Sequence, residues 1–116
     1  MGLYFLHEHP HNAKSWGNAL MQELLRKEGV YRVRGDMCTW GMKQCDQEGE
    51  GLIKKPTGFL TNSREIAKIL ESLCNGDHRH IELIGGRAKS AEVYPDELCK
   101  DILKGLTNQM KVDERI

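Results

Sequence analysis

The residues best suited to chemistry lie in the segment CNGDHRH, which contains Cys74, His78 and His80. One thiolate and two imidazoles, separated by a glycine-containing turn, are ligands that tetrahedral zinc prefers. The alternative is a helix end at which Cys74 is buried as a small apolar residue and the two histidines lie near the negative end of the helix dipole. The spacing does not fix a fourth ligand, and three residues elsewhere could supply it: Cys38, Cys99 and His7.

A second polar cluster, HEHPH, directly follows the apolar residues 3–6. The short apolar run predicts a strand buried on both faces, as in a parallel sheet. Ligands of open α/β sheets bind beyond the carboxyl ends of strands, so Glu8 is a candidate acid or hydrogen-bonding group. The alternative is an ordinary polar strand end. His7, His9 and His11 alternate, so an extended chain places them on one side, where they form either a metal site or a chance run.

A third cluster, KKPTGFLTNS, combines Lys54 and Lys55 with the start of a predicted helix at Asn62 and Ser63. Backbone N–H groups at a helix start can bind phosphate, and lysines nearby would add positive charge. Lys54, Lys55 and Asn62 are therefore weak candidates for nucleic-acid contact. Ordinary helix capping explains Asn62 and Ser63 equally well.

Apolar spacing predicts three helices, over residues 13–27, 62–73 and 95–106. Short apolar or β-branched runs predict strands over residues 3–6, 30–33, 52–60 and 81–84, the third either interrupted at Pro56 or split into two. This order predicts the α/β class. The expected architecture is a partial Rossmann-like three-layer unit with a small mixed sheet of three to four short strands and three helices.

The helix over residues 62–73 has the clearest pattern. Asn62 and Glu65 match a capping box, and an apolar stripe follows them. We expect the stripe to pack against a sheet that contains residues 3–6. It consists of Ile66, Ile69, Leu70 and Leu73.

The 116 residues allow one domain, expected over residues 1–106 with a frayed polar tail at 107–116. The few strands, and an apolar strand at the very start, suggest the carboxy-terminal part of a larger domain. Lys plus Arg and Asp plus Glu both number 17, which argues against a dedicated phosphate-tracking protein. The sequence has no bilayer-length apolar run and no signal peptide, so we expect an intracellular protein, cytoplasmic or nuclear, with no membrane partner.

Several stretches resemble a segment of copia-type retrotransposon polyproteins of dinoflagellates and other protists. They are YFLHEHP, KPTGFLTN, GGRAKSAEVYP and the LC at Leu98, and the resemblance runs from Tyr4 to about Leu106. In those polyproteins the segment lies beside integrase and reverse-transcriptase regions. The resemblance implies a mobile-element origin, a link to DNA integration, and nucleic acid or other polyprotein segments as partners.

A weaker similarity is to the later half of DNA cytosine-5 methyltransferases. In that family a strand ends in Glu-Asn-Val or Glu-Asn-Pro and the Glu contacts the cytosine ring; HEHP places Glu8 there, with His9 in place of Asn. TWGM and KKPTGFLTN look like later parts of that family, which implies a backbone or phosphate contact for Lys55. The cofactor-binding strand and the Pro-Cys loop have no counterpart.

The resemblance therefore implies S-adenosylmethionine binding only if an upstream half exists, and that half would itself be a partner. We expect no catalysis from the chain alone. The alternative interpretation is a small zinc-binding module that engages nucleic acid or protein.

Overall fold

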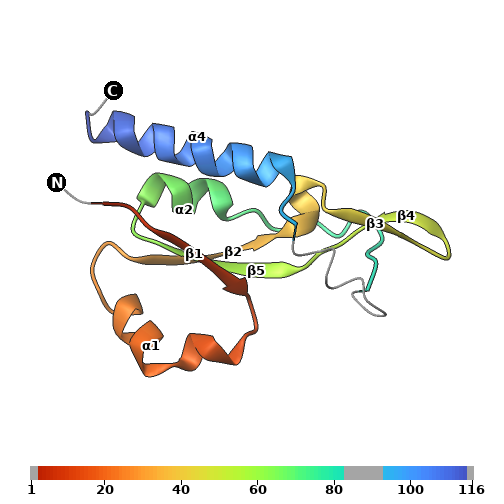
Figure 1. Ribbon diagram of the computed structural model, residues 1–116, viewed down its shortest axis with the longest axis horizontal. Coiled ribbons are helices and arrows are strands. Elements are labelled where there is room, and N and C mark those ends of the chain that lie inside the picture. The colour runs from red at the N-terminus through yellow and green to blue at the C-terminus, as the bar shows by residue number, and fades with distance from the viewer. Residues whose placement is uncertain (1–2, 83–92, 115–116) are drawn as a thin grey trace.

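The computed structural model describes residues 3–82 and 93–114, which form a three-stranded sheet, a two-stranded hairpin and several helices (Figure 1). The first half comprises β1 (Leu6–Pro10), the 3-10 helix η1 (Lys14–Gly17), α1 (Ala19–Leu25), β2 (Tyr31–Asp36) and the 3-10 helix η2 (Met37–Trp40). The second half comprises β3 (Lys43–Asp46), β4 (Gly49–Leu52), β5 (Pro56–Thr61), α2 (Arg64–Leu70) and α4 (Asp96–Val112).

The three-stranded sheet has the order β1–β5–β2, and both strand pairs are antiparallel. Phe59 in the central strand lies opposite Glu8 on one side and Val33 on the other, and it is fully buried. The hairpin is antiparallel too, and the described residues add only an isolated parallel bridge between Leu52 and His80. Mixed helices and strands fit the predicted α/β class, but the parallel pairing expected of a Rossmann-like unit is not what these strands form.

The amino-terminal strand differs from its prediction. It begins at Leu6 rather than at residue 3, and Leu3 is 91% exposed, so this run is not buried on both faces. β1 is an edge strand of an antiparallel sheet, in which neighbouring side chains point to opposite faces. A short apolar run does not distinguish this case from a fully buried strand.

The single helix expected over residues 13–27 is two short helices, η1 and α1. Asn18 separates them in an extended conformation, and its side-chain oxygen accepts a hydrogen bond from the Leu20 N–H at 2.8 Å. Asn prefers this capping role to a helix interior. Because of this break, the predicted apolar face does not form: Trp16 is buried, whereas Leu20 is 72% exposed.

The N-cap of helix α2 lies one residue later than predicted. Ser63 is its N-cap, with Oγ accepting from the Ile66 N–H at 3.1 Å. Asn62 instead accepts from the Phe5 N–H at 2.9 Å and donates to the Leu3 carbonyl at 2.8 Å, so it fastens the amino-terminal segment.

The apolar stripe of α2 is confirmed for most of its members. Ile66 and Leu70 are buried and Ile69 is half-buried, but Leu73 is 59% exposed because the helix ends before it.

Helix α4 lies along α2 on one side of the sheet (Figure 1). The tail expected to fray from residue 107 is helical as far as Val112, which corrects that prediction. Gln109 explains the difference: it is buried, and its side-chain oxygen accepts from the Ser63 hydroxyl at 3.0 Å and the Glu65 N–H at 3.1 Å. The mostly polar sequence after residue 106 therefore contains one inward-facing side-chain amide, that of Gln109, which joins α4 to α2.

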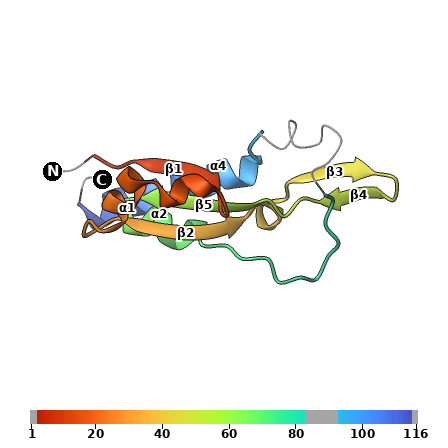
Figure 2. The ribbon, with the colours of Figure 1, turned by 90° about the horizontal axis from the view of Figure 1, so that it is seen from below.

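The β3–β4 hairpin extends away from the body of the molecule (Figures 1 and 2). The predicted strand over residues 52–60 is two strands, with β4 ending at Leu52 and β5 starting at Pro56. Proline suits the first residue of a strand because it has no N–H to donate. The strand predicted over residues 81–84 and the GGRAKSA segment lie partly or wholly outside the described residues.

Candidate metal centre

Four potential metal ligands converge at the end of the sheet nearest the hairpin. One ligand atom each from Cys38, Cys74, His78 and His80 lies within 4.8 Å of the others. Cys38 comes from η2, directly after β2, and the other three come from the irregular segment that follows α2. Of the three residues that could have supplied the fourth ligand, the fold selects Cys38; Cys99 is exposed on α4 and His7 lies on β1.

The distances inside the cluster suit a tetrahedral metal. Cys74 Sγ lies 3.6 Å from His78 Nε2 and 3.5 Å from His80 Nε2, and the two Nε2 atoms are 3.0 Å apart. Zinc bonds of about 2.0–2.3 Å imply ligand atoms separated by roughly 3.3–3.8 Å in a regular tetrahedron. Cys74, His78 and His80 are therefore within a few tenths of an ångström of the arrangement that zinc requires, and the Cys38 thiol lies within 4.8 Å of them.

Asp77 orients the first histidine ligand. Its carboxylate lies 2.6 Å from His78 Nδ1, and this hydrogen bond is the main cause that lowers the pKa of Asp77. A proton held on Nδ1 leaves the Nε2 lone pair facing Cys74 and His80. Carboxylates hydrogen-bonded to ligating histidines fix the ring in this way in many zinc sites.

Asp36 joins the two segments that supply the ligands. Its buried carboxylate accepts from the Cys74 N–H at 2.9 Å and from Arg34 Nε at 3.1 Å. Its own N–H donates to the Ser72 carbonyl at 2.8 Å. Sequence analysis did not single out Asp36, and the available signal was its position two residues before Cys38. This carboxylate holds the end of β2 against the loop after α2.

Burial shifts the pKa of two of the four candidate ligands. Burial and a hydrogen bond with Cys74 raise the pKa of the Cys38 thiol to about 12. Burial, helped by the nearby charges of His78 and Lys54, lowers the pKa of His80 and favours its neutral form. Neutral imidazole is the ligating form, and a bound dication deprotonates a coordinating thiol. The donor set therefore fits a dication with a preference for sulfur and nitrogen.

The residues predicted to contact nucleic acid do not form one group. Lys54 and Lys55 precede β5, whereas Asn62 follows its last residue, and six strand residues separate them. A strand of that length spans about 20 Å, which is too far for one phosphate. The backbone carbonyl of Lys54 accepts from the Met37 N–H, so this lysine lies beside the metal centre instead.

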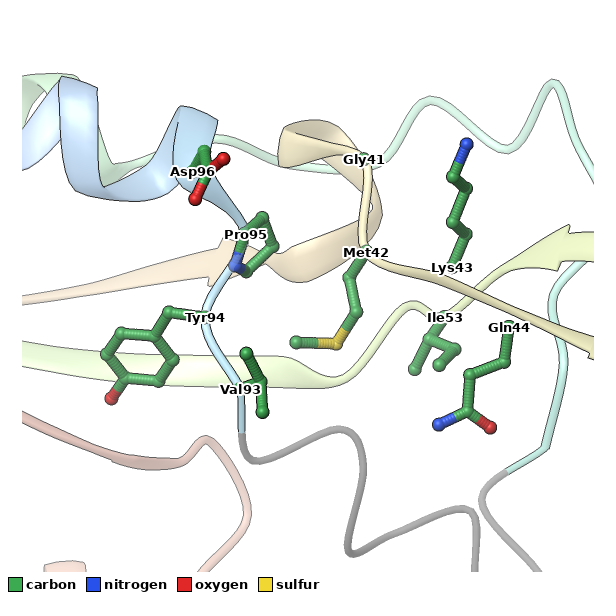
Figure 3. Close-up of a pocket in the computed structure, with 9 residues that line it drawn as sticks. All are labelled: Gly41, Met42, Lys43, Gln44, Ile53, Val93, Tyr94, Pro95 and Asp96. Carbon is green, nitrogen blue, oxygen red and sulfur yellow. The ribbon is translucent and has the colours of Figure 1, made fainter.

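Glu8 faces the amino-terminal end of α4 rather than the metal centre. Its carboxylate is hydrogen-bonded to the hydroxyl of Tyr94, whose pKa is raised chiefly by burial and further by this contact. Tyr94 also lines a hollow of about 350 Å³ between the start of α4 and the start of the hairpin (Figure 3). Met42 and Ile53 form its apolar floor, and none of the described residues that line the hollow is a cysteine or a histidine.

The alternation of the histidines in HEHPH is observed for the first two. The rings of His7 and His9 stack at 5.9 Å on the outer face of the sheet, and both meet the edge of Trp16. Trp16 lies over Gly58, where an added Cβ would come within 2.5 Å of the indole. Neither histidine belongs to a metal-ligand group of three or more among the described residues.

No family model matches the chain, and no curated protein or solved structure is significantly similar to it. Among residues 3–82 and 93–114, no helix has both the length and the apolar character needed to cross a bilayer. Fold and site together define a small protein of mixed helices and strands with a Cys2His2 candidate metal centre.

Proposed function

We propose that this chain is a zinc-binding module in which the metal has a structural role. The observation that carries the proposal is the convergence of Cys38, Cys74, His78 and His80 within 4.8 Å, from two segments separated by more than thirty residues. Two thiols and two imidazoles favour zinc over magnesium or calcium, which prefer oxygen ligands.

The number of ligands favours a structural site over a catalytic one. Catalytic zinc keeps one position for water or substrate, whereas structural zinc takes all four ligands from the protein. Here the chain supplies all four. The metal would link η2, which belongs to the core, to the segment after α2, which has no helix or strand of its own between Leu70 and the bridge at His80.

Metal analysis of the purified chain tests this function. We expect one zinc per chain, and a cobalt-substituted protein with the visible absorption of a tetrahedral thiolate site. Cys38→Ser should abolish tight binding, because a three-ligand site is left beside a buried hydroxyl. Cys45→Ser is the matched control, since Cys45 is an exposed thiol on the hairpin. Absence of zinc from the wild-type chain, or full zinc affinity in Cys38→Ser, would contradict the proposal.

The outer face of the sheet favours an anionic partner for this module. The side chains that its two edge strands place there include His7 and His9 on β1 and Arg32 and Arg34 on β2. Arg34 is ion-paired with the buried carboxylate of Asp36, whereas Arg32 is exposed. Together with the retrotransposon resemblance, this supports nucleic acid as the partner.

Oligonucleotide binding at several salt concentrations tests that second function. Arg32→Ala should weaken binding and make it less dependent on salt, because one phosphate contact is lost. Arg64→Ala, on α2 at the other side of the sheet, should leave binding unchanged. Equal effects of the two variants would show that the outer face is not the binding surface.

A methyltransferase-like role for Glu8 stays a prediction that rests on the resemblance. We expect no methyl transfer to cytosine-containing DNA by the chain alone, since it has no counterpart of the cofactor strand or the nucleophile loop. Methylation by the purified chain that disappears in Glu8→Gln would overturn this expectation.

A further inference from the structure

We infer that Arg79 couples metal binding to the β3–β4 hairpin, so that each orders the other. Arg79 stands between the two histidine ligands in the sequence, yet its side chain points away from the metal centre and into the hairpin. The inference rests on the proposed zinc site and adds a positioning residue and a metal-dependent element to it.

The guanidinium of Arg79 holds both ends of the hairpin turn. It donates to the two carboxylate oxygens of Asp46 at 2.9 and 3.0 Å. It also donates to the backbone carbonyls of Gly49 at 2.8 Å and Glu50 at 3.1 Å. A planar group with five N–H donors can satisfy a carboxylate and two carbonyls at once, which a lysine cannot do.

The backbone around Arg79 strengthens the same connection. The Ile81 N–H donates to the Leu52 carbonyl at 2.8 Å, and His80 forms a parallel bridge with Leu52. Gly51 allows this close approach, because a Cβ there would lie 2.9 Å from Ile81 Cγ1 and 3.0 Å from Arg79 Cζ. Strand β4 therefore packs directly against the segment that contains His78 and His80.

This arrangement makes the hairpin a support for two of the four ligands. Residues 71–82 contain no helix or strand, so no regular ladder of backbone hydrogen bonds fixes the segment that contains His78 and His80. Arg79 and the Leu52 bridge provide that restraint from the hairpin side, and a metal at the ligand atoms would provide it from the other side. Coupling between two sites is reciprocal, so the factor by which the hairpin strengthens zinc binding equals the factor by which zinc stabilises the docked hairpin.

Zinc affinity of Arg79→Ala is the first measurement, made by competition with a chromophoric chelator. We expect affinity to fall roughly tenfold, the size of effect usual for residues that orient metal ligands. Arg79→Lys should recover only part of the loss, because it keeps the charge but not the forked geometry. Gly51→Ala should weaken binding from the hairpin side without altering a charge. Arg26→Ala is the control, an exposed arginine at the end of α1.

Hydrogen exchange of the hairpin amides is the second measurement. Zinc should raise the protection of the β3 and β4 amides in the wild type by about the factor lost in affinity, and it should do so far less in Arg79→Ala. Unchanged zinc affinity in Arg79→Ala, or hydrogen-exchange protection of the hairpin that does not change with zinc, would contradict the coupling while leaving the zinc site intact. Failure of the wild type to bind zinc would instead sink the proposed function, so the two failures are distinguishable.

Discussion

Different interactions stabilise the two ends of this molecule. At one end α2 and α4 cover the sheet, and the contacts there join fully buried side chains such as Phe59, Leu70 and Leu98. At the other end the hairpin and residues 71–82 lie side by side (Figures 1 and 2). Apart from the buried Ile81, they meet chiefly through charged and polar groups around the candidate metal centre. Apolar burial is non-directional, whereas hydrogen bonds and metal ligands demand fixed geometry.

The two ends should therefore respond to different perturbations. Loss of apolar area should lower the stability of the whole chain, because the core is continuous from the sheet to both helices. Loss of the metal should act first on the hairpin end, where the described segment after α2 lacks regular structure.

The largest effect is expected from Phe59→Ala. Phe59 is fully buried at the centre of the sheet and meets Trp40 edge-on at 6.1 Å. Truncation should lower the free energy of unfolding by about 3–5 kcal/mol. Leu103→Ala, at an exposed position of α4, should change it by less than about 0.5 kcal/mol. Denaturant unfolding measures both, and similar losses in the two variants would contradict the assignment of the core.

The second-largest loss of stability is expected from removal of the metal. If zinc binds the folded chain and not the unfolded chain, free zinc at about 100 times its dissociation constant stabilises the fold by about 2.7 kcal/mol. A chelator should remove that amount from the wild type and nothing from Cys38→Ser, which already lacks the site. Thermal unfolding with and without chelator checks this, and the amides of β5 should stay protected at temperatures where those of β3 and β4 exchange.

A smaller loss is expected from Gly105→Ala in α4. Alanine favours a helix by about 1 kcal/mol over glycine, so the sequence alone suggests stabilisation. In the structure an added Cβ would lie 2.9 Å from Ile66 Cα and 3.0 Å from Ile69 Cγ2, and overpacking of this kind costs about 1–3 kcal/mol. We therefore expect a net loss of about 1 kcal/mol, measured by denaturant unfolding. Gly17→Ala, with open space around it, is the control and should be nearly neutral.

The smallest effect concerns the contact between Tyr94 and Glu8. Burial first, and the Glu8 carboxylate second, raise the pKa of Tyr94 above its ordinary value of 10.0. A raised pKa in the folded chain contributes stability that is fully present below about pH 10 and is lost as pH rises through the folded-state value. Tyr94→Phe should remove this alkaline loss. Absorbance titration of tyrosinate in Glu8→Gln should show a shift that is reduced but not abolished, because burial remains.

The candidate site was predicted in part. The thiol and two imidazoles of CNGDHRH are close in sequence, so a single turn brings them together whatever the rest of the fold does. Cys38 is 36 residues before Cys74. Its choice over Cys99 or His7 depends on where β2 ends relative to α2, which no local pattern encodes. Asp36 and Arg79 were missed for the same reason, since their partners Cys74 and Asp46 are distant in sequence.

Several short-range features of this protein could be predicted from the sequence: the apolar stripe of α2, the strand boundary at Pro56 and the candidate ligands after Leu73. These depend on residue periodicity, proline geometry and turn length, which act over a few residues. The tertiary structure was needed to show that the strands pair antiparallel, that Gln109 continues α4 into a buried contact, and that Cys38 completes the candidate metal centre. Those outcomes depend on which distant segments exclude water together, and that is a property of the whole chain.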